Sequence, residues 1–80
     1  MAHDMPLSAV PEGSTWRVSR IAAGYGLSRR LSELGFVGDA PVSVCGRTNR
    51  SIIVRLCGQR YALSRGIAQH IYVSEASVHG

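Results

Sequence analysis

The chain contains no lysine and only five acidic residues, so its nine basic side chains are all arginines. The resulting net charge of +4 suits an acidic partner such as a nucleic acid, an anionic membrane or an acidic protein. The arginines are scattered along the chain, and they form no run of like charges of the kind that marks an interaction tail. Charge alone therefore does not choose among these partners.

Long hydrophobic runs are also missing. No apolar stretch approaches the roughly 18 residues of a membrane span, so we expect no insertion into a bilayer. The N-terminal sequence MAHDMPLSAV lacks the basic start and apolar block of a secretory signal peptide. The two cysteines, Cys45 and Cys57, lie in separate apolar segments and make no disulfide scaffold. We therefore expect a cytoplasmic protein with reduced, partly buried thiols.

The motifs of common catalytic and cofactor sites are absent. The sequence GYG at 24–26 precedes a helical pattern, but Arg29 stands where a dinucleotide fingerprint needs its third glycine, and a P-loop needs a lysine. None of the three histidines forms a metal-ligand set with a neighbouring cysteine or acid. No base is placed to activate Cys57 as a nucleophile, and the acids show no paired motif. We expect no cofactor, no metal site and no enzymatic activity.

Short alternating segments separated by turns make up most of the chain. We predict strands over 15–21, 42–45, 52–57, around 61–63 and over 71–73, with turns at 11–13, 48–51 and 58–59 and one helical turn within 64–70. This pattern is typical of a mainly β fold, a small closed antiparallel barrel of about five strands with one short helix. We expect a single domain over 1–80, folded from about 7 to 73, with flexible tails at both ends.

The one predicted helix covers residues 28–34. Ser28 is its expected N-cap, and Gly35 is its expected left-handed stop. Leu27, Leu31 and Leu34 share one face and should anchor the helix to the core. Arg29 and Glu33 lie four residues apart on the opposite face, where they can pair in water, and Arg30 is also expected to be exposed.

The aromatic residues are few and mostly predicted to be internal. Alternation points Trp16 and Tyr61 inward, Phe36 follows the helix stop where it makes an apolar contact, and Tyr25 is left on the surface. Ile53 and Cys57 occupy outward strand positions beside Arg55. They form either a partly covered face of the barrel or a small apolar contact patch, and an exposed Ile53 would favour weak self-association.

Several motifs in a fixed order point to one family. The stretch GLSRRLSELGF at 26–36 is preceded by LSAVPEG at 7–13 and followed by V-x-V at 42–44, V-x-L-x-G at 54–58, Y-A-L at 61–63 and A-x-x-I-x-V at 68–73. From Leu7 to Val73 the chain resembles the FeoA family of bacterial ferrous iron transport accessory proteins. The resemblance implies an SH3-like barrel. The loop at 48–51 is shorter than is common in that family.

The resemblance also implies a partner, the FeoB-type membrane ferrous iron transporter with its cytosolic GTP-binding domain. On this hypothesis the chain is a regulatory module that binds the transporter through Tyr25, Arg29, Arg30 and Glu33, with Ile53 and Arg55 as further candidate contacts. Two alternatives stay open, a small nucleic-acid-binding barrel and an iron or transition-metal chaperone or sensor. We expect a protein partner rather than a nucleic acid.

Overall fold

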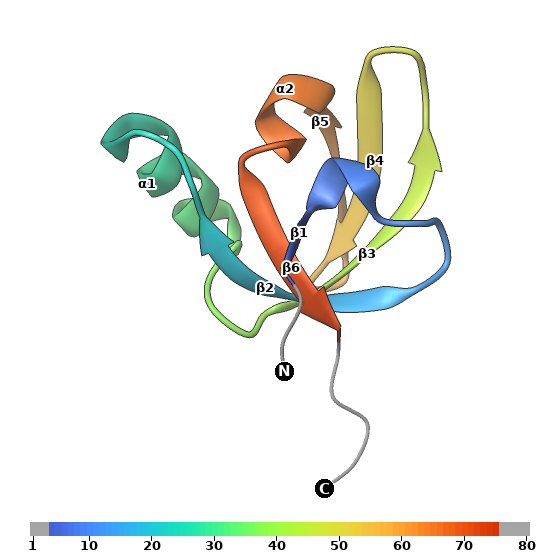
Figure 1. Ribbon diagram of the computed structural model, residues 1–80, viewed down its shortest axis with the longest axis horizontal. Helices are drawn as coiled ribbons and strands as arrows, with labels where there is room; N and C mark the ends of the chain where they lie inside the picture. The colour runs from blue at the N-terminus through green and yellow to red at the C-terminus, as the bar shows by residue number, and fades with distance from the viewer. Residues whose placement is uncertain (1–3, 76–80) are drawn as a thin grey trace, which may run out of the picture.

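A computed structural model describes residues 4–75 of the chain (Figure 1). The strands are β1 (Met5–Pro6), β2 (Thr15–Ile21), β3 (Pro41–Arg47), β4 (Ser51–Leu56), β5 (Gln59–Ser64) and β6 (Ile71–Glu75). The helical elements are the 3-10 helix η1 (Leu7–Ala9) and the α-helices α1 (Tyr25–Leu34) and α2 (Arg65–Ala68). The prediction of a mainly β fold with one substantial helix is confirmed.

All the strand pairs are antiparallel, and the strands form one curled sheet in the order β1-β6-β2-β3-β4-β5. In the described part of the chain no hydrogen-bonded ladder joins the outer strands β1 and β5. Between these two edges α2 packs against η1, as Figure 1 shows. At this seam the barrel is therefore completed by side-chain packing, whereas hydrogen bonds connect its other neighbouring strands.

The sheet contains one strand more than predicted, because the folded part extends beyond the predicted residues 7–73 at both ends. Met5 pairs with Val73, and Pro6 pairs with Tyr72, so β1 is held by strand β6 at the far end of the sequence. Strand β6 also runs on through Ser74 and Glu75, which were predicted to be flexible. The predictions for 1–3 and 76–80 lie outside the described residues.

The core follows the predicted alternation closely. Buried side chains project inward at every second position of the central strands: Trp16 and Val18 from β2, Val42 and Val44 from β3, and Ile52, Val54 and Leu56 from β4. Trp16 satisfies its indole nitrogen by donating to the Ser14 hydroxyl at 2.7 Å. Phe36 is buried, and Tyr61 packs on the core while half-exposed, so their predicted inward positions are confirmed.

The β4–β5 hairpin turns one residue earlier than predicted. Cys57 and Gly58 occupy the two turn positions with φ angles of 54° and 81°, and Leu56 pairs with Gln59 across the turn. Two consecutive positive φ angles are what a type I′ turn requires. Cys57 is therefore a turn residue rather than a strand residue. Both Cys45 and Cys57 are exposed, which corrects the expectation of partly buried thiols.

Helix α1 begins three residues before its predicted start. Gly24 is the N-cap, and the predicted cap Ser28 lies within the helix, where its hydroxyl donates to the Ala23 carbonyl at 3.1 Å. The predicted C-terminus is confirmed. Gly35 has a φ of 116°, and the amide of Phe36 donates to the Leu31 carbonyl at 3.0 Å, as in a Schellman motif.

Only part of the predicted leucine face anchors the helix. Leu31 is buried and Leu27 packs partly against the core, but 42% of Leu34 is exposed. The prediction that Leu34 anchors the helix is therefore wrong. Helical spacing identifies residues that share a face, but it does not show how far the barrel extends along that face.

Gly35→Ala is expected to lower the free energy of unfolding by about 2 kcal/mol, because an L side chain is strained at this φ. An added Cβ would also come within 3.3 Å of Leu56 Cδ2. Urea unfolding followed by circular dichroism measures the loss. Gly38→Ala is the matched control, since Gly38 has an ordinary φ and open space around it. Equal losses in the two variants would contradict the strain argument.

Candidate interaction surface

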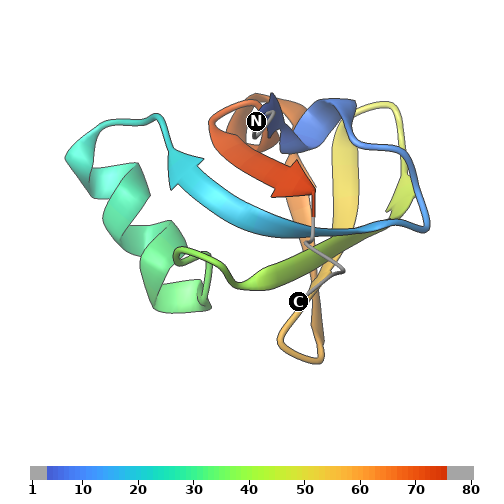
Figure 2. The same ribbon diagram turned by 60° about the horizontal axis from the view of Figure 1, so that its bottom comes forward.

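Helix α1 projects from the side of the barrel and is held mainly at its C-terminal end. Figures 1 and 2 show the helix beside the sheet, joined to β2 and β3 by loops. The rings of Phe36 and Tyr61 lie 6.0 Å apart, and the Tyr61 hydroxyl donates to the Leu34 carbonyl at 3.4 Å. Gly35 also packs close to Leu56. The N-terminal half of the helix is therefore presented outward.

Four of the predicted contact residues lie on this projecting helix and are exposed: Tyr25, Arg29, Arg30 and Glu33. Tyr25 is 79% exposed, which leaves nearly its whole ring in contact with solvent. Arg29 Nε lies 3.3 Å from Glu33 Oε2, so the predicted pair forms, with both side chains about two-thirds exposed. Such a pair adds little stability, and both groups stay available to a partner.

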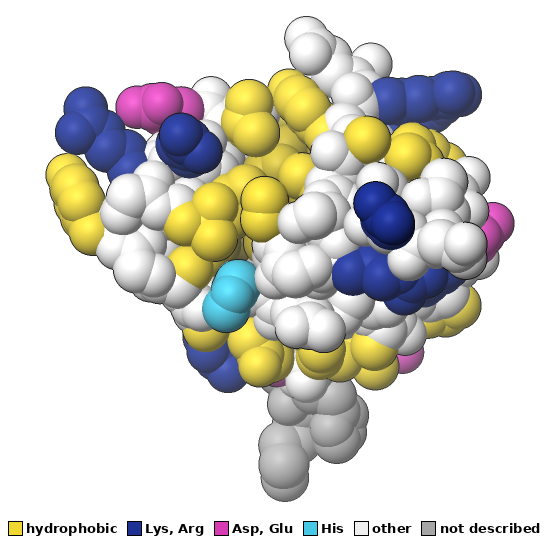
Figure 3. All heavy atoms as spheres, turned by 90° about the horizontal axis from the view of Figure 1, so that it is seen from above, with side chains coloured by type: hydrophobic (Ala, Val, Ile, Leu, Met, Phe, Trp, Pro, Cys, Tyr) yellow, Lys and Arg dark blue, Asp and Glu magenta, His cyan; other side chains and the backbone are white. Residues whose placement is uncertain are grey.

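Apolar side chains extend this surface beyond the predicted residues. Leu34 and Val37 are 42% and 49% exposed, and with Tyr25 they are the large exposed hydrophobic residues of the described chain. A hollow of about 370 Å³ between α1 and β2 is lined by residues of both elements, including Ile21, and by Phe36 and Val37, which follow the helix. Seen from above, apolar side chains gather between the α1 side of the molecule and the barrel (Figure 3).

We call Tyr25, Arg29, Arg30, Glu33, Leu34 and Val37 the helix surface. Leu34 was missed as a surface residue because its spacing is that of a core position. Val37 was missed because it immediately follows the helix stop, where the sequence carries no periodicity.

The other two predicted contacts lie elsewhere, on the outer face of β4. Ile53 is half-buried and packs close to Gly46. A Cβ added to Gly46 would lie 3.6 Å from Ile53 Cγ1. Arg55 is exposed. Because Cys57 lies in the turn, it does not continue the outward strand positions of Ile53. The structure thus gives little support to an apolar patch here, and it places Arg55 on a different element from the helix surface.

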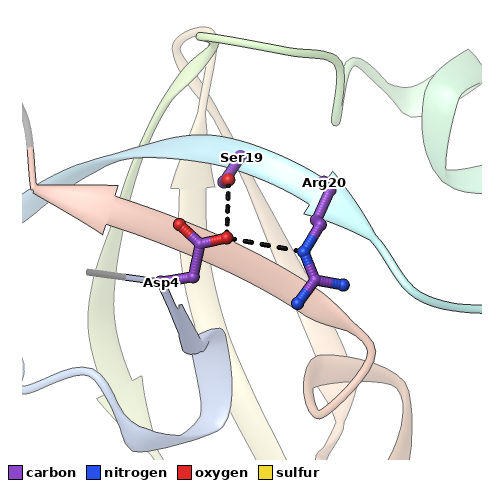
Figure 4. Close-up of polar contacts among 3 residues, drawn as sticks. All are labelled: Asp4, Ser19 and Arg20. Carbon is purple, nitrogen blue, oxygen red and sulfur yellow. Dashed lines mark hydrogen bonds and ion pairs between the residues drawn. The ribbon is translucent and has the colours of Figure 1, made fainter. Parts of the chain in front are cut away.

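A polar cluster that the sequence did not reveal ties the N-terminal segment to β2. Asp4 Oδ2 accepts a hydrogen bond from the Ser19 hydroxyl at 3.0 Å and lies 3.4 Å from Arg20 Nε (Figure 4). The ladder between β2 and β6 shifts register between Val18 and Arg20. Arg20 also lies over the Tyr72 ring, 4.2 Å from its centroid, so this half-buried aromatic already has a cation–π partner.

Neither a metal-ligand cluster nor a helix able to span a membrane is found within residues 4–75. No cluster of three or more histidine, cysteine, aspartate or glutamate side chains there could hold a metal ion. His70 is exposed, and its Nδ1 lies 2.9 Å from the Ala22 carbonyl oxygen. None of the described helices has both the length and the apolar character needed to cross a membrane. His3 and His79 lie outside the described residues.

Comparison with known proteins places the chain in a family. Residues 5–75 match the FeoA domain. The chain belongs to the FeoA domain family. It is 32% identical over 75 residues to a protein of Methanocaldococcus jannaschii named Fe(2+) transport protein A, and the match covers 94% of this chain and 92% of that protein. The family resemblance drawn from the sequence motifs is therefore confirmed.

Solved FeoA structures share the fold. The FeoA protein of Chlorobium tepidum is 29% identical, with a TM-score of 0.83 over 91% of this chain and 71% of that one. FeoA of Stenotrophomonas maltophilia, solved with zinc and described as an SH3-domain protein, is 28% identical, with a TM-score of 0.77 over 86% and 88% of the two chains. The predicted SH3-like fold is confirmed, and the FeoA helix motif at 26–36 lies within α1 and its C-terminal stop.

Proposed function

We propose that this FeoA-family chain is an accessory and regulatory module of ferrous iron uptake that acts by binding another protein and catalyses no reaction. Its partner is the cytosolic part of a FeoB-type transporter, so the module works in the cytoplasm. The name of the M. jannaschii relative supports a role in Fe(2+) transport. The S. maltophilia relative, described as a candidate activating factor of ferrous iron transport, supports a regulatory role.

The observation that carries the proposal is the projecting helix α1. The large exposed hydrophobic residues of the described chain, Tyr25, Leu34 and Val37, lie on this helix or just after it. Charged residues, including Arg29 and Arg30, border them. Apolar and aromatic contacts at the centre with a polar rim are the usual composition of a protein–protein interface. Because the helix is held at its C-terminal end, a partner can contact the rest without disturbing the core.

The charges of the helix surface are expected to orient the complex more than to hold it together. Arg30 has no ion-pair partner among residues 4–75, and the pair between Arg29 and Glu33 is open to solvent. An acidic region of the transporter would therefore meet two guanidinium groups on one side of α1. Arginine forks bind carboxylates in a fixed bidentate geometry, which would fix the orientation of the docked module.

Reversing both charges tests the proposal. The double variant Arg29→Glu, Arg30→Glu should bind the purified cytosolic domain of a FeoB-type transporter about tenfold more weakly or worse, because like charges would face each other across the interface. Isothermal titration calorimetry measures the dissociation constant. The control is Arg50→Glu, which reverses one exposed arginine in the β3–β4 turn, away from α1. Unchanged binding by a folded double variant would refute the assignment of this surface.

A further inference from the structure

The outer face of the sheet carries a row of polar side chains that crosses four strands. The ladder pairs Thr15 with Ser43, Ser43 with Arg55, and Arg55 with Arg60. The neighbours of these residues, including Trp16 and Val54, point into the core. The row therefore faces away from the core, and we call it the sheet row.

The two arginines of the sheet row face each other directly. Arg55 on β4 and Arg60 on β5 are cross-strand partners, and both are exposed. Like charges in this position destabilise a strand pair. No acidic side chain within the described residues forms an ion pair with either one, and the ion pairs seen there involve Arg20 and Arg29. Among residues 4–75 the two guanidinium groups thus lie together without an ion-pair partner.

Two shallow hollows lie along the same row. One, of about 260 Å³, is lined by Thr15, Ser43 and Arg55 together with Cys57 and the turn. The other, of about 390 Å³, is lined by the same three residues and extends to Glu12, the one acidic residue in its lining. Arg17, two residues after Thr15 and on the same face of β2, adds a third arginine. It is half-buried and pairs with Ser74 of β6. Thr15, Ser43 and Arg55 line both hollows, and Arg60 lies beside Arg55 on the next strand. We call the hollows and the sheet row together the trough.

We propose that this trough binds an acidic peptide segment of a partner protein, whose carboxylates would neutralise Arg55 and Arg60. Guanidinium groups bind carboxylates through paired, charge-assisted hydrogen bonds, and an acid placed between these arginines would remove their mutual repulsion. The hydroxyls of Thr15 and Ser43 offer further donors beside the two arginines.

A peptide suits the trough better than a single-stranded nucleic acid does. Nucleic-acid surfaces of this size combine basic groups with aromatic rings on which bases stack. No aromatic residue lines either hollow. The most exposed tyrosine, Tyr25, lies on α1, and Tyr72 lies beneath Arg20. The trough shares no residue with the helix surface, so substitutions can test the two surfaces one at a time.

A single charge reversal at Arg60 tests the proposal. Arg60→Glu converts a repulsive cross-strand pair into an attractive one, so the variant should melt at a higher temperature than the original protein. It should also bind a fluorescein-labelled octaglutamate peptide about tenfold more weakly, because one of the two carboxylate-binding groups is lost. Fluorescence anisotropy at low ionic strength, where screening is weak, measures the binding. A gain in stability with a loss of binding is not expected of a residue whose role is only structural.

The matched control is Arg50→Glu, which makes the same change in net charge at an exposed position outside the trough. It should leave octaglutamate binding within about twofold of the original value. An equal loss in the control would overturn the proposal, because attraction by net charge would then explain the binding. The proposal also fails if an oligothymidylate of matched charge binds as tightly as the peptide and loses affinity in Arg60→Glu.

Discussion

Replacing Phe36 with alanine is expected to lower the free energy of unfolding by about 3–5 kcal/mol, the usual cost of truncating a buried phenylalanine. The Phe36 side chain is 1% exposed and lies between the end of α1 and the barrel. Truncation would leave a cavity and remove the ring contact with Tyr61. For a domain of this size the total is roughly 4–12 kcal/mol, so a large part of the stability would be lost.

Urea unfolding monitored by Trp16 fluorescence measures this loss, since the indole is the only one in the chain and is buried in the barrel. Tyr25→Ala serves as the control. It also removes an aromatic ring from the α1 region, but from a side chain that is 79% exposed, so we expect a change within about 0.5 kcal/mol. If Phe36→Ala cost no more than this control, Phe36 would not be the anchor of the helix.

Arg47→Ala is expected to cost roughly 3 kcal/mol, the order of magnitude for two hydrogen bonds to a charged group. Arg47 Nη1 donates to the Ser8 carbonyl at 3.0 Å, and Nη2 donates to the Val10 carbonyl. Both bonds join β3 to the segment that contains η1, nearly forty residues earlier in the chain. Without them, two carbonyls of a partly buried segment lose their charged donors.

The same unfolding measurement applies, with two comparison variants. Arg47→Lys keeps a charge but loses the planar fork that reaches two carbonyls, so its loss should be intermediate. Arg17→Ala removes an arginine that is also half-buried on a strand but makes no side-chain hydrogen bond or ion pair among the described residues, and it should change stability by about 0.5 kcal/mol or less. Similar losses for Arg17→Ala and Arg47→Ala would contradict the assigned role of the two hydrogen bonds.

Local patterns in the sequence were enough to predict much of the fold. Strand β2 has the predicted bounds, because alternation from Thr15 to Ile21 ends at glycine-rich loop residues. The stop of α1 at Gly35 and the helical turn of α2 were also predictable, since their capping residues are local signals. Strand β1 has no comparable signal, because it is defined by pairing with β6 at the other end of the chain.

The start of α1 shows how a local rule can mislead. Gly24 and Gly26 are poor helix formers, and Ser28 is a good cap, so propensity alone favours a later start. In the structure Gly24 takes the capping position, and Gly26 lies within the first turn. The helix gains an extra turn, and that turn carries Tyr25 outward. The prediction of Tyr25 as a surface residue was therefore correct although the predicted helix began too late.

The candidate surfaces were predictable only where their residues are neighbours in sequence. Tyr25, Arg29 and Glu33 follow one helical period, and they lie together as expected. The pairing of Arg55 with Arg60 depends on the hairpin turn, which was placed one residue late. Arg47 looked like any other scattered arginine, since its carbonyl partners are brought close only by the folded barrel. Composition cannot distinguish an arginine that binds a partner from one that holds the fold together.

The pairing of β1 with β6 brings the two ends of the described chain to the same edge of the sheet. Met5 lies opposite Val73, and Figure 1 shows the chain entering and leaving the barrel side by side. A domain with neighbouring termini can be inserted into a loop of another protein, or repeated in tandem, without stretching either connection. This geometry makes the barrel a unit that a longer polypeptide can carry whole, with α1 and the sheet row still exposed.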